Sequence, residues 1–248
     1  QPRRAPGSYP TGKQCRLVIV SAGMARSGST MQQSLLLAAL SALNIRPAVN
    51  KYFNFHWHMA KEWSREKMEA DLRGASRKIN MMRADDVAVL KSHEFDERAM
   101  RLCRQYLVFT THRHPEEILI SGEGAWGGSR LTPDGAARSM AIATLRQTCW
   151  RKYAAEDTSN AEIRANVSAV FERYITKVGV ALYGRDFSQH LVSPRSRAML
   201  LEAAAGNPST ANRSRARVGL SSLARKRVFC EFRSWMLAYG YYPKHYQQ

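Results

Sequence analysis

The sequence is poor in cysteine and has no hydrophobic run of membrane-spanning length. Its four cysteines are far apart among 248 residues, with no Cys-x-x-Cys pair, so we expect no zinc or redox motif and no disulfide-stapled scaffold but reduced, buried thiols. The longest apolar run, 35–43, is interrupted by Ser41 and falls short of the roughly 18 residues that a transmembrane helix needs. With 44% hydrophobic and 23% charged residues, the composition excludes a disordered or fibrous chain.

Acidic residues are also scarce. Asp and Glu number 20 against 38 Lys and Arg, which gives a net charge of +18, and 28 of the cations are Arg. Because the planar guanidinium group grips phosphate or sulfate through two hydrogen bonds, this bias suits an anionic ligand. Codon bias in a GC-rich genome is an equally simple explanation of the Arg content.

The apolar patterns predict one α/β domain. We expect residues 1–15, with three Pro and two Gly, to form a flexible tail, and residues 16–248 to form a single domain. Short apolar runs at 17–20, 87–90 and 107–110 indicate strands buried on both faces. Helical patterns cover 31–43, 63–72, 98–104, 116–121, 133–152, 160–178 and 220–239. The alternation predicts a three-layer sandwich with a central parallel β-sheet.

The loop after the first expected strand has the spacing of a phosphate-binding loop. Gly23, Gly28 and Thr30 match the nucleoside-triphosphate P-loop pattern G-x-x-x-x-G-K-[ST], but Ser29 replaces its Lys. The nearest cation is Arg26. A kinase or GTPase would lose its hold on the β and γ phosphates without that Lys, whereas a loop for a single phosphate would not.

The segment Arg26-Ser27-Gly28-Ser29-Thr30 resembles the 5′-phosphosulfate loop of sulfotransferases, [RK]-S-G-[ST]-[ST]. That family uses 3′-phosphoadenosine-5′-phosphosulfate (PAPS) as its sulfuryl donor and releases 3′,5′-adenosine bisphosphate (PAP). The resemblance covers about residues 16–242 and implies a P-loop-like sulfotransferase fold that needs no metal. It also implies that the backbone of Ser27 to Thr30 holds the 5′-phosphate, helped by the hydroxyl groups of Ser29 and Thr30.

Two further segments resemble the 3′-phosphate site of the family. Arg113 and Ser121 have the family spacing of an Arg-x-Pro turn followed by a helix. Since Arg113 follows an expected strand and Ser121 lies about two helical turns on, both can reach one phosphate. The late basic segment Arg215-Ala216-Arg217 resembles the loop that closes over the same phosphate.

Lys91 and His93 resemble the second-strand Lys-[ST]-His segment, whose His is the usual catalytic base of cytosolic members. On a strand both side chains point to one face, so both can line one cleft. We expect His93 to deprotonate the acceptor, and Lys91 and Arg26 to stabilise the sulfuryl group and the bridging oxygen.

The sequence departs from the family pattern in three places. Ala216 replaces a Gly of the late loop, and Met31 replaces the aromatic residue that often follows the 5′ loop. A Tyr-Glu-Asp segment on a later strand often supplies the adenine-stacking ring, and 180–187 is the candidate here, with Tyr183 as the ring.

Two other functions stay open at this stage. A P-loop kinase with a relocated basic residue would need Mg²⁺ and an acidic ligand, for which Asp85-Asp86 is the candidate. A non-enzymatic polyanion-binding protein would depend on the net charge alone.

We expect the acceptor to be a small molecule or carbohydrate that carries a hydroxyl or amine group. An anionic acceptor would suit the positive charge of the chain. Aromatic residues at 52–63 suit either an acceptor pocket or a core. We expect no specific nucleic-acid partner, no metal and no membrane span. A cytoplasmic location is expected, with the Golgi lumen as the alternative.

Overall fold

The computed structural model describes residues 15–23, 27–53, 82–93, 95, 97–126, 132–184, 194, 198, 202 and 220–241. Most of the expected tail lies outside these residues, but Cys15 begins the first strand. The expected helix at 63–72 lies outside them as well.

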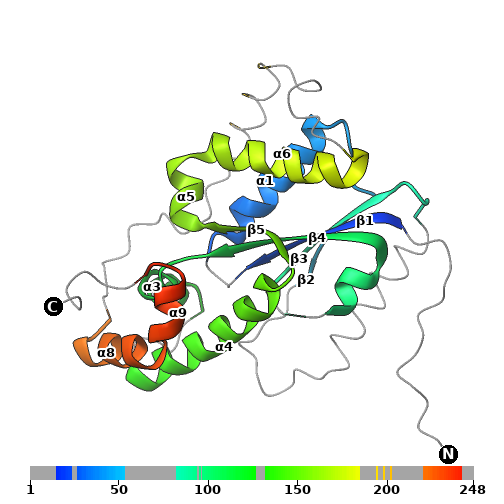
Figure 1. Cartoon of the computed structure of the whole chain (residues 1–248). Helices are drawn as coiled ribbons and strands as arrows, with labels where there is room; N and C mark the ends of the chain where they lie inside the picture. Colours follow the sequence, from blue (N-terminus) through cyan, green and yellow to red (C-terminus); the bar gives the residue numbers. More distant parts are fainter. Residues whose placement is uncertain are drawn as a thin grey trace, which may run out of the picture.

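A parallel β-sheet forms the centre of the molecule (Figure 1). Its five strands have the order β2-β3-β1-β4-β5, and every neighbouring pair is parallel. The strands are β1 (Cys15–Gly23), β2 (Val49–Phe53), β3 (Val87–Ser92), β4 (Cys103–His112) and β5 (Ala154–Ser159). The three strands at its centre, β3, β1 and β4, are those that the apolar runs predict.

Helices cover both faces of the sheet, as Figure 1 shows. On one face lie α1 (Ser29–Ala42), α5 (Asn160–Ala165) and α6 (Val167–Tyr183). On the other lie the 3₁₀ helix η2 (Glu97–Arg101) and α4 (Pro133–Arg151), and α4 packs against α3 (Pro115–Trp126) and α8 (Ser222–Glu231), which leads into α9 (Arg233–Ala238). The expected α/β fold with a central parallel sheet is therefore confirmed.

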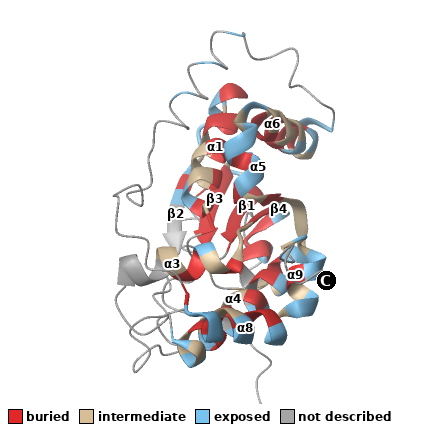
Figure 2. Ribbon diagram, turned by 90° about the vertical axis from the view of Figure 1, so that its left-hand side faces the viewer, coloured by how far each residue is buried: buried red, intermediate tan, exposed pale blue. Residues whose placement is uncertain are grey.

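Strand β1 contributes side chains to the hydrophobic cores on both faces of the sheet. Leu17 and Ile19 pack with α1 and α6, while Val18 and Val20 pack with η2 and Trp150 of α4. All four side chains are fully buried, and Figure 2 shows buried residues running through the sheet and the helix faces that contact it. A continuous β-branched run fits this position because both faces of the strand are covered.

Several expected elements differ in the structure. The expected helix 98–104 is a short 3₁₀ helix that ends at Arg101, because β4 begins at Cys103 and pairs with β1. The pattern at 160–178 covers two helices divided at Asn166, whose side chain accepts a hydrogen bond from Ala169 N–H. The pattern at 220–239 is likewise divided at Phe232. None of the helices in the described residues is long and apolar enough to cross a membrane.

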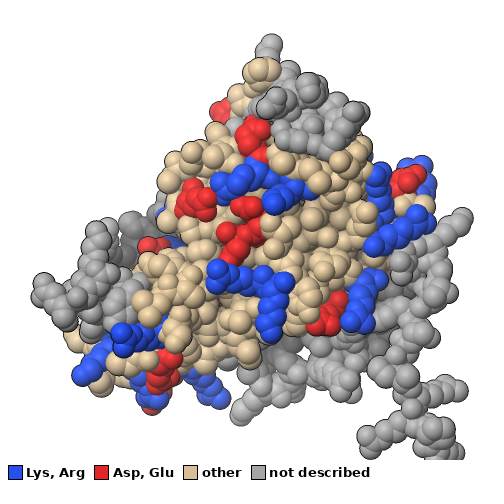
Figure 3. Space-filling view, viewed as in Figure 1, with Lys and Arg blue, Asp and Glu red and all other residues tan. Residues whose placement is uncertain are grey.

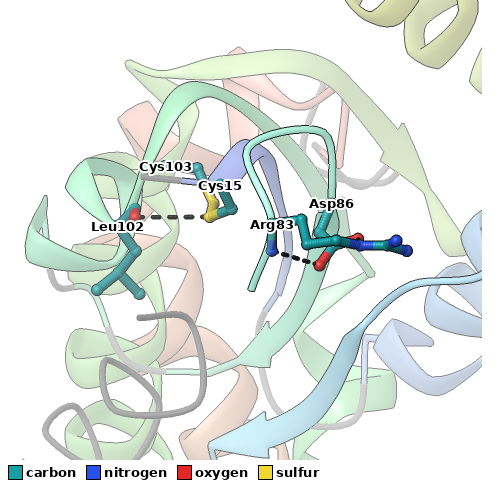
Figure 4. Close-up of a disulfide and its surroundings, with 5 residues drawn as sticks. All are labelled: Cys15, Arg83, Asp86, Leu102 and Cys103. Atoms are coloured by element: carbon teal, nitrogen blue, oxygen red, sulfur yellow. Dashed lines mark hydrogen bonds and ion pairs between the residues drawn. A yellow bond between two sulfur atoms is a disulfide. The ribbon is translucent and has the colours of Figure 1, made fainter. Parts of the chain in front are cut away.

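The expectation of reduced thiols is wrong for two cysteines. Cys15 and Cys103 form a disulfide, shown in Figure 4, across 88 residues of sequence. The pairing follows from strand register, because the two residues are direct neighbours at the amino ends of β1 and β4, with Cα atoms 4.6 Å apart. Cys149 and Cys230 are free thiols.

Candidate anion-binding and catalytic site

The candidate site lies at the carboxyl edge of the sheet, the side at which the parallel strands have their carboxyl ends. Because the strands are parallel, the segments that follow β1, β3 and β4 all emerge at this edge. Strand β1 leads into the loop before α1, β3 carries Lys91 and ends beside His93, and β4 leads to Arg113. This edge of a parallel sheet is where ligands bind in open α/β folds.

The start of α1 is arranged for an anion. Gly28 is the N-cap with φ 97°, a left-handed conformation that favours glycine, and it offers no side-chain cap. The first helical hydrogen bond runs from Gln32 N–H to the Gly28 carbonyl (3.1 Å), so the amides of Ser29, Thr30 and Met31 have no intrahelical acceptor. No acidic residue lies in this first turn. Unpaired amides and the helix dipole together favour a negatively charged ligand.

Thr111 of β4 anchors the loop. The Ser27 and Thr111 hydroxyl groups are hydrogen-bonded at 2.7 Å, and both residues are fully buried. A Cβ atom on Gly23 would lie 2.4 Å from Thr111 Oγ1, so only glycine fits beside it. The hydroxyl of Ser27 is therefore committed to the protein, which leaves its backbone for a ligand. No pattern in the sequence points to Thr111, because its partner is 84 residues away.

Lys91 contacts the start of α1 directly. Its Nζ atom donates to Thr30 Oγ1 at 2.7 Å, and the residue is only 5% exposed. Burial lowers the pKa of Lys91 from 10.5 to about 8. In nucleoside-triphosphate P-loops the hydroxyl at the Thr30 position binds Mg²⁺. Here that hydroxyl is bonded to an ammonium group of the protein.

His93 contacts the other end of the same loop. Its Nδ1 atom lies 2.8 Å from the Gly23 carbonyl oxygen. A carbonyl only accepts hydrogen bonds, so Nδ1 carries the proton, and in the neutral ring the lone pair lies on Nε2. Lys91 and His93, which the resemblance to the Lys-[ST]-His segment selects, thus contact the two ends of one loop.

Arg113 and Ser121 lie along one side of α3. The Arg113 Nε atom donates to Glu117 Oε2 at 2.5 Å. Ser121 lies one helical turn beyond Glu117, and residues four apart in a helix share a face. Glu117, which the sequence analysis did not select, orients the guanidinium group of Arg113.

The remaining predicted site residues fall into two groups. Arg26, Arg215, Ala216 and Arg217 lie outside the described residues. Tyr183 ends α6 with the Arg16 guanidinium carbon 6.0 Å from its ring centroid. Since Arg16 lies at the amino end of β1, Tyr183 is about 20 Å from the loop by the length of the strand, which is too far to stack on a nucleotide bound there.

The expectation of a strand is wrong for 180–183, because α6 continues through Tyr183, and the last strand in the described residues is β5. Strand β5 contains Glu156 and Asp157, preceded by Ala155. In the Tyr-Glu-Asp pattern of the family that the sequence resembles, an aromatic residue precedes the Glu-Asp pair, whereas alanine precedes it here. Asp157 Oδ1 accepts a hydrogen bond from Thr110 Oγ1 (2.5 Å), which joins β5 to β4.

The histidines on either side of Arg113 have structural partners. Burial lowers the pKa of His112 and of His114. His112 Nδ1 and the Tyr241 hydroxyl form a hydrogen bond (2.6 Å), and His114 Nδ1 accepts one from Glu116 N–H (3.3 Å). Within the described ranges, no group of three or more His, Cys, Asp or Glu is placed to hold a metal ion.

Asp85 and Asp86, the candidate metal ligands of a kinase, lie at the opposite edge of the sheet. Asp86 immediately precedes β3, and its carboxylate accepts a hydrogen bond from Arg83 N–H (2.7 Å) in the turn that Figure 4 shows near the disulfide. These carboxylates are a strand length away from the loop before α1.

Acidic side chains neutralise many of the described cations. Figure 3 shows Lys and Arg side chains interspersed with Asp and Glu on one face of the molecule. Arg225 pairs with Glu116, and Arg227 with Glu231 and Asp134. Ion pairs of this kind offset part of the positive charge of the described residues around α3, α4 and α8.

Comparisons with known proteins give remote structural similarities. No family model matches the sequence, and no curated protein matches it. Two crystal structures of retinol dehydratase, one with androsterone and the inactive cofactor PAP and one with retinol and PAP, are each 14% identical, with TM-scores of 0.44 and 0.46. Each alignment covers 76% of this chain and 64% of the retinol dehydratase chain, less than two thirds of it.

The sulfotransferase domain of the Synechococcus PCC 7002 olefin synthase is 13% identical with a TM-score of 0.36, over 90% of this chain and 96% of that domain. Similarities this remote do not assign an activity, so the function proposed below depends on the geometry of the site.

Proposed function

We propose that the protein is a PAPS-dependent sulfotransferase. The observation that carries this proposal is the contact of Lys91 and His93 with the two ends of one loop, at Thr30 and at the Gly23 carbonyl. A cation and a base thus lie beside a helix N-terminus whose first amides have no intrahelical acceptor. Sulfuryl transfer needs these three parts: an anion site, a positive charge near the leaving oxygen, and a base for the nucleophile.

The donor would be held at two positions. The amides of Ser29 and Thr30 and the backbone of Ser27 and Gly28 would bind its 5′-phosphate at the start of α1. Arg113, held by Glu117, and Ser121 on the same side of α3 would bind its 3′-phosphate. The resemblance adds Arg26, Arg215, Ala216 and Arg217 to these contacts as predictions.

PAPS supplies an activated sulfuryl group. Nε2 of His93 would accept the proton of the acceptor as its oxygen or nitrogen attacks the sulfur in line with the bridging oxygen. The Lys91 ammonium group, and Arg26 by prediction, would stabilise the charge that grows on that bridging oxygen. The Gly23 carbonyl would stabilise the protonated His93 ring through Nδ1.

The same geometry disfavours the kinase alternative. The Thr30 hydroxyl is bonded to Lys91, and the candidate carboxylates Asp85 and Asp86 lie at the other edge of the sheet. A protein cation at this place provides positive charge without a metal ion, so we propose that donor binding does not need Mg²⁺.

The disulfide supports an oxidising compartment rather than the expected cytoplasm. Disulfides such as Cys15–Cys103 persist in secretory compartments and are rare in reducing ones. We therefore favour the lumenal alternative, in which a carbohydrate or another hydroxyl-bearing or amine-bearing acceptor would be sulfated.

A transfer assay tests the proposed function. The protein would be incubated with PAPS and a panel of hydroxyl and amine acceptors, with and without Mg²⁺, and PAP release and acceptor mass would be measured. We expect PAP release that depends on the acceptor, an acceptor that gains one sulfuryl group, and no requirement for Mg²⁺. A protein that transfers phosphate from ATP instead, only in the presence of Mg²⁺, would contradict the proposal.

A further inference from the structure

Asn160 lies beside the start of α1 although it belongs to a distant part of the sequence. It is the first residue of α5, directly after β5, and is only 4% exposed. A Cβ atom on Gly28 would lie 2.1 Å from Asn160 Nδ2 and 3.1 Å from its Cγ. The carboxamide therefore lies against the α-carbon of Gly28, next to the backbone amides of the first turn of α1.

The Asn160 carboxamide has no hydrogen-bond partner in the part of the chain that the structure describes. A nearly buried amide without a partner lowers stability, and most such groups in proteins are paired. A polar ligand at the loop would supply the missing partner.

Asn160 is not needed to cap its own helix. Ser159 does so, since its hydroxyl accepts a hydrogen bond from Glu162 N–H at 3.0 Å. Asn166 shows the ordinary structural use of the same residue type nearby. It is exposed, and its Oδ1 accepts from Ala169 N–H at 3.0 Å at the start of α6.

We propose that Asn160 is a further ligand-binding residue of the anion site, whose Nδ2 donates to an oxygen of the bound phosphate or sulfate group. The inference rests on the proposed function, because it concerns the same site. It gives the site a donor from the β5–α5 junction, in addition to the backbone amides of α1. It also explains why residue 28 must lack a side chain, since a Cβ there would displace this donor.

Substitution by aspartate separates this role from simple packing. Aspartate has the shape of asparagine but would place a negative charge against the anion, whereas alanine removes both the shape and the donor. If Asn160 only packs on Gly28, Asn160→Asp should resemble the wild type and Asn160→Ala should be the worse variant. If Asn160 binds the anion, Asn160→Asp should be the worse variant.

The experiment is calorimetric titration with PAP, with melting temperatures recorded in the presence and absence of inorganic sulfate. We expect Asn160→Ala to weaken PAP binding about tenfold and Asn160→Asp about a hundredfold or more, the range for a hydrogen bond to a charged group. Asn166→Ala is the matched control, and its PAP affinity should stay within about twofold of the wild type.

PAP binding by Asn160→Asp at wild-type affinity would overturn the inference. If Asn160→Asp does not fold, unchanged PAP affinity in Asn160→Ala would do the same. If the wild type does not bind PAP, the proposed function fails. The melting temperatures with and without sulfate then test whether Asn160 binds an anion. Sulfate should raise the melting temperature of the wild type and not that of Asn160→Asp, and equal responses would overturn the inference.

Discussion

Strands β1 and β4 are joined covalently at their amino ends and only by hydrogen bonds at their carboxyl ends. At the amino ends, Cys15 and Cys103 form a disulfide in a buried, largely apolar environment. At the carboxyl ends, the hydroxyl groups of Ser27 and Thr111 form the connection, and glycine occupies positions 23 and 28.

The two ends therefore serve different purposes. The disulfide fixes the strand pair and stabilises the fold. The carboxyl edge carries unpaired amides, a buried lysine and an unpartnered carboxamide, groups that lower stability until a ligand binds them. The stability that the disulfide adds at one end offsets the destabilising groups at the other. Such a trade between stability and function is common in enzymes. Changes at one end should mainly affect stability, and changes at the other mainly affect binding and turnover.

Removal of the base should have the largest effect on activity. His93→Ala should lower the rate of sulfuryl transfer about 100-fold to 10,000-fold, the usual contribution of general base catalysis. PAP affinity should change little, because Nε2 acts on the acceptor rather than on the nucleotide. Steady-state rates with the best acceptor and titration with PAP would check both parts. Equal losses of rate and PAP affinity would contradict the assigned role.

Loss of the disulfide should have the largest effect on stability. In the chain-entropy model, a cross-link across 88 residues contributes about 4–5 kcal/mol to the free energy of unfolding. We expect Cys15→Ser to lower that free energy by about 3–5 kcal/mol in urea unfolding, while folded protein keeps its PAP affinity within about twofold.

Cys230→Ser, at an exposed free thiol, is the matched control and should leave the free energy of unfolding unchanged. Alkylation of the unreduced, unfolded protein should modify two thiols, those of Cys149 and Cys230. Modification of all four would contradict the disulfide.

Gly28→Ala should introduce both backbone strain and a steric clash. A left-handed φ costs about 1–2 kcal/mol for a residue with a Cβ atom, and the contact with Asn160 adds to this. Gly184 ends α6 with φ 72° and has open space around it, so Gly184→Ala should show the strain alone.

We expect Gly28→Ala to lower the free energy of unfolding by about 1–2 kcal/mol more than Gly184→Ala. Asn160→Ala should remove most of that difference when combined with Gly28→Ala. A difference that persists in the double variant would show that some other contact causes it.

The buried lysine should give binding and stability opposite dependences on pH. Lys91 carries a proton below about pH 8 in the folded protein and below about 10.5 when unfolded. Between these values the unfolded chain binds more protons, so the contribution of Lys91 to the free energy of unfolding rises with pH. PAP favours the ammonium form, so its affinity should fall, by up to about tenfold, as pH rises through about 8.

Lys91→Arg, which keeps its charge, should abolish most of the pH dependence of PAP binding between pH 7 and 9. Titrations at several pH values in one buffer series would measure it. An unchanged dependence in the variant would show that another group titrates.

The elements that the sequence predicts are those with a simple periodic pattern. The runs at 17–20, 87–90 and 107–110 predict β1, β3 and β4 because both faces of these strands are buried. Strand β5 was missed since its sequence, AAEDTS, is polar, as suits a strand whose one partner in the described sheet is β4. The disulfide could not be predicted, because the register that pairs Cys15 with Cys103 is a property of the folded sheet.

The residues of the candidate site also divide into those that the sequence predicts and those that it does not. Lys91 and His93 follow from the resemblance to the Lys-[ST]-His segment, and Gly23 and Gly28 from the spacing of a phosphate loop. Thr111 and Asn160 do not, because common polar residues gain a role at the loop only through contacts distant in sequence. Tyr183 was selected for its residue type, and the sheet places it at the opposite edge.

Calorimetric titration of the wild type and Arg113→Ala with PAP, in the presence and absence of Mg²⁺, tests the central claim most directly. We predict that PAP binds with micromolar affinity in the presence or absence of Mg²⁺, at least about a hundredfold more weakly to Arg113→Ala, and much more tightly than ATP. No binding of PAP, or Mg²⁺-dependent binding that favours ATP, would contradict the assignment of this edge of the sheet to a sulfuryl donor.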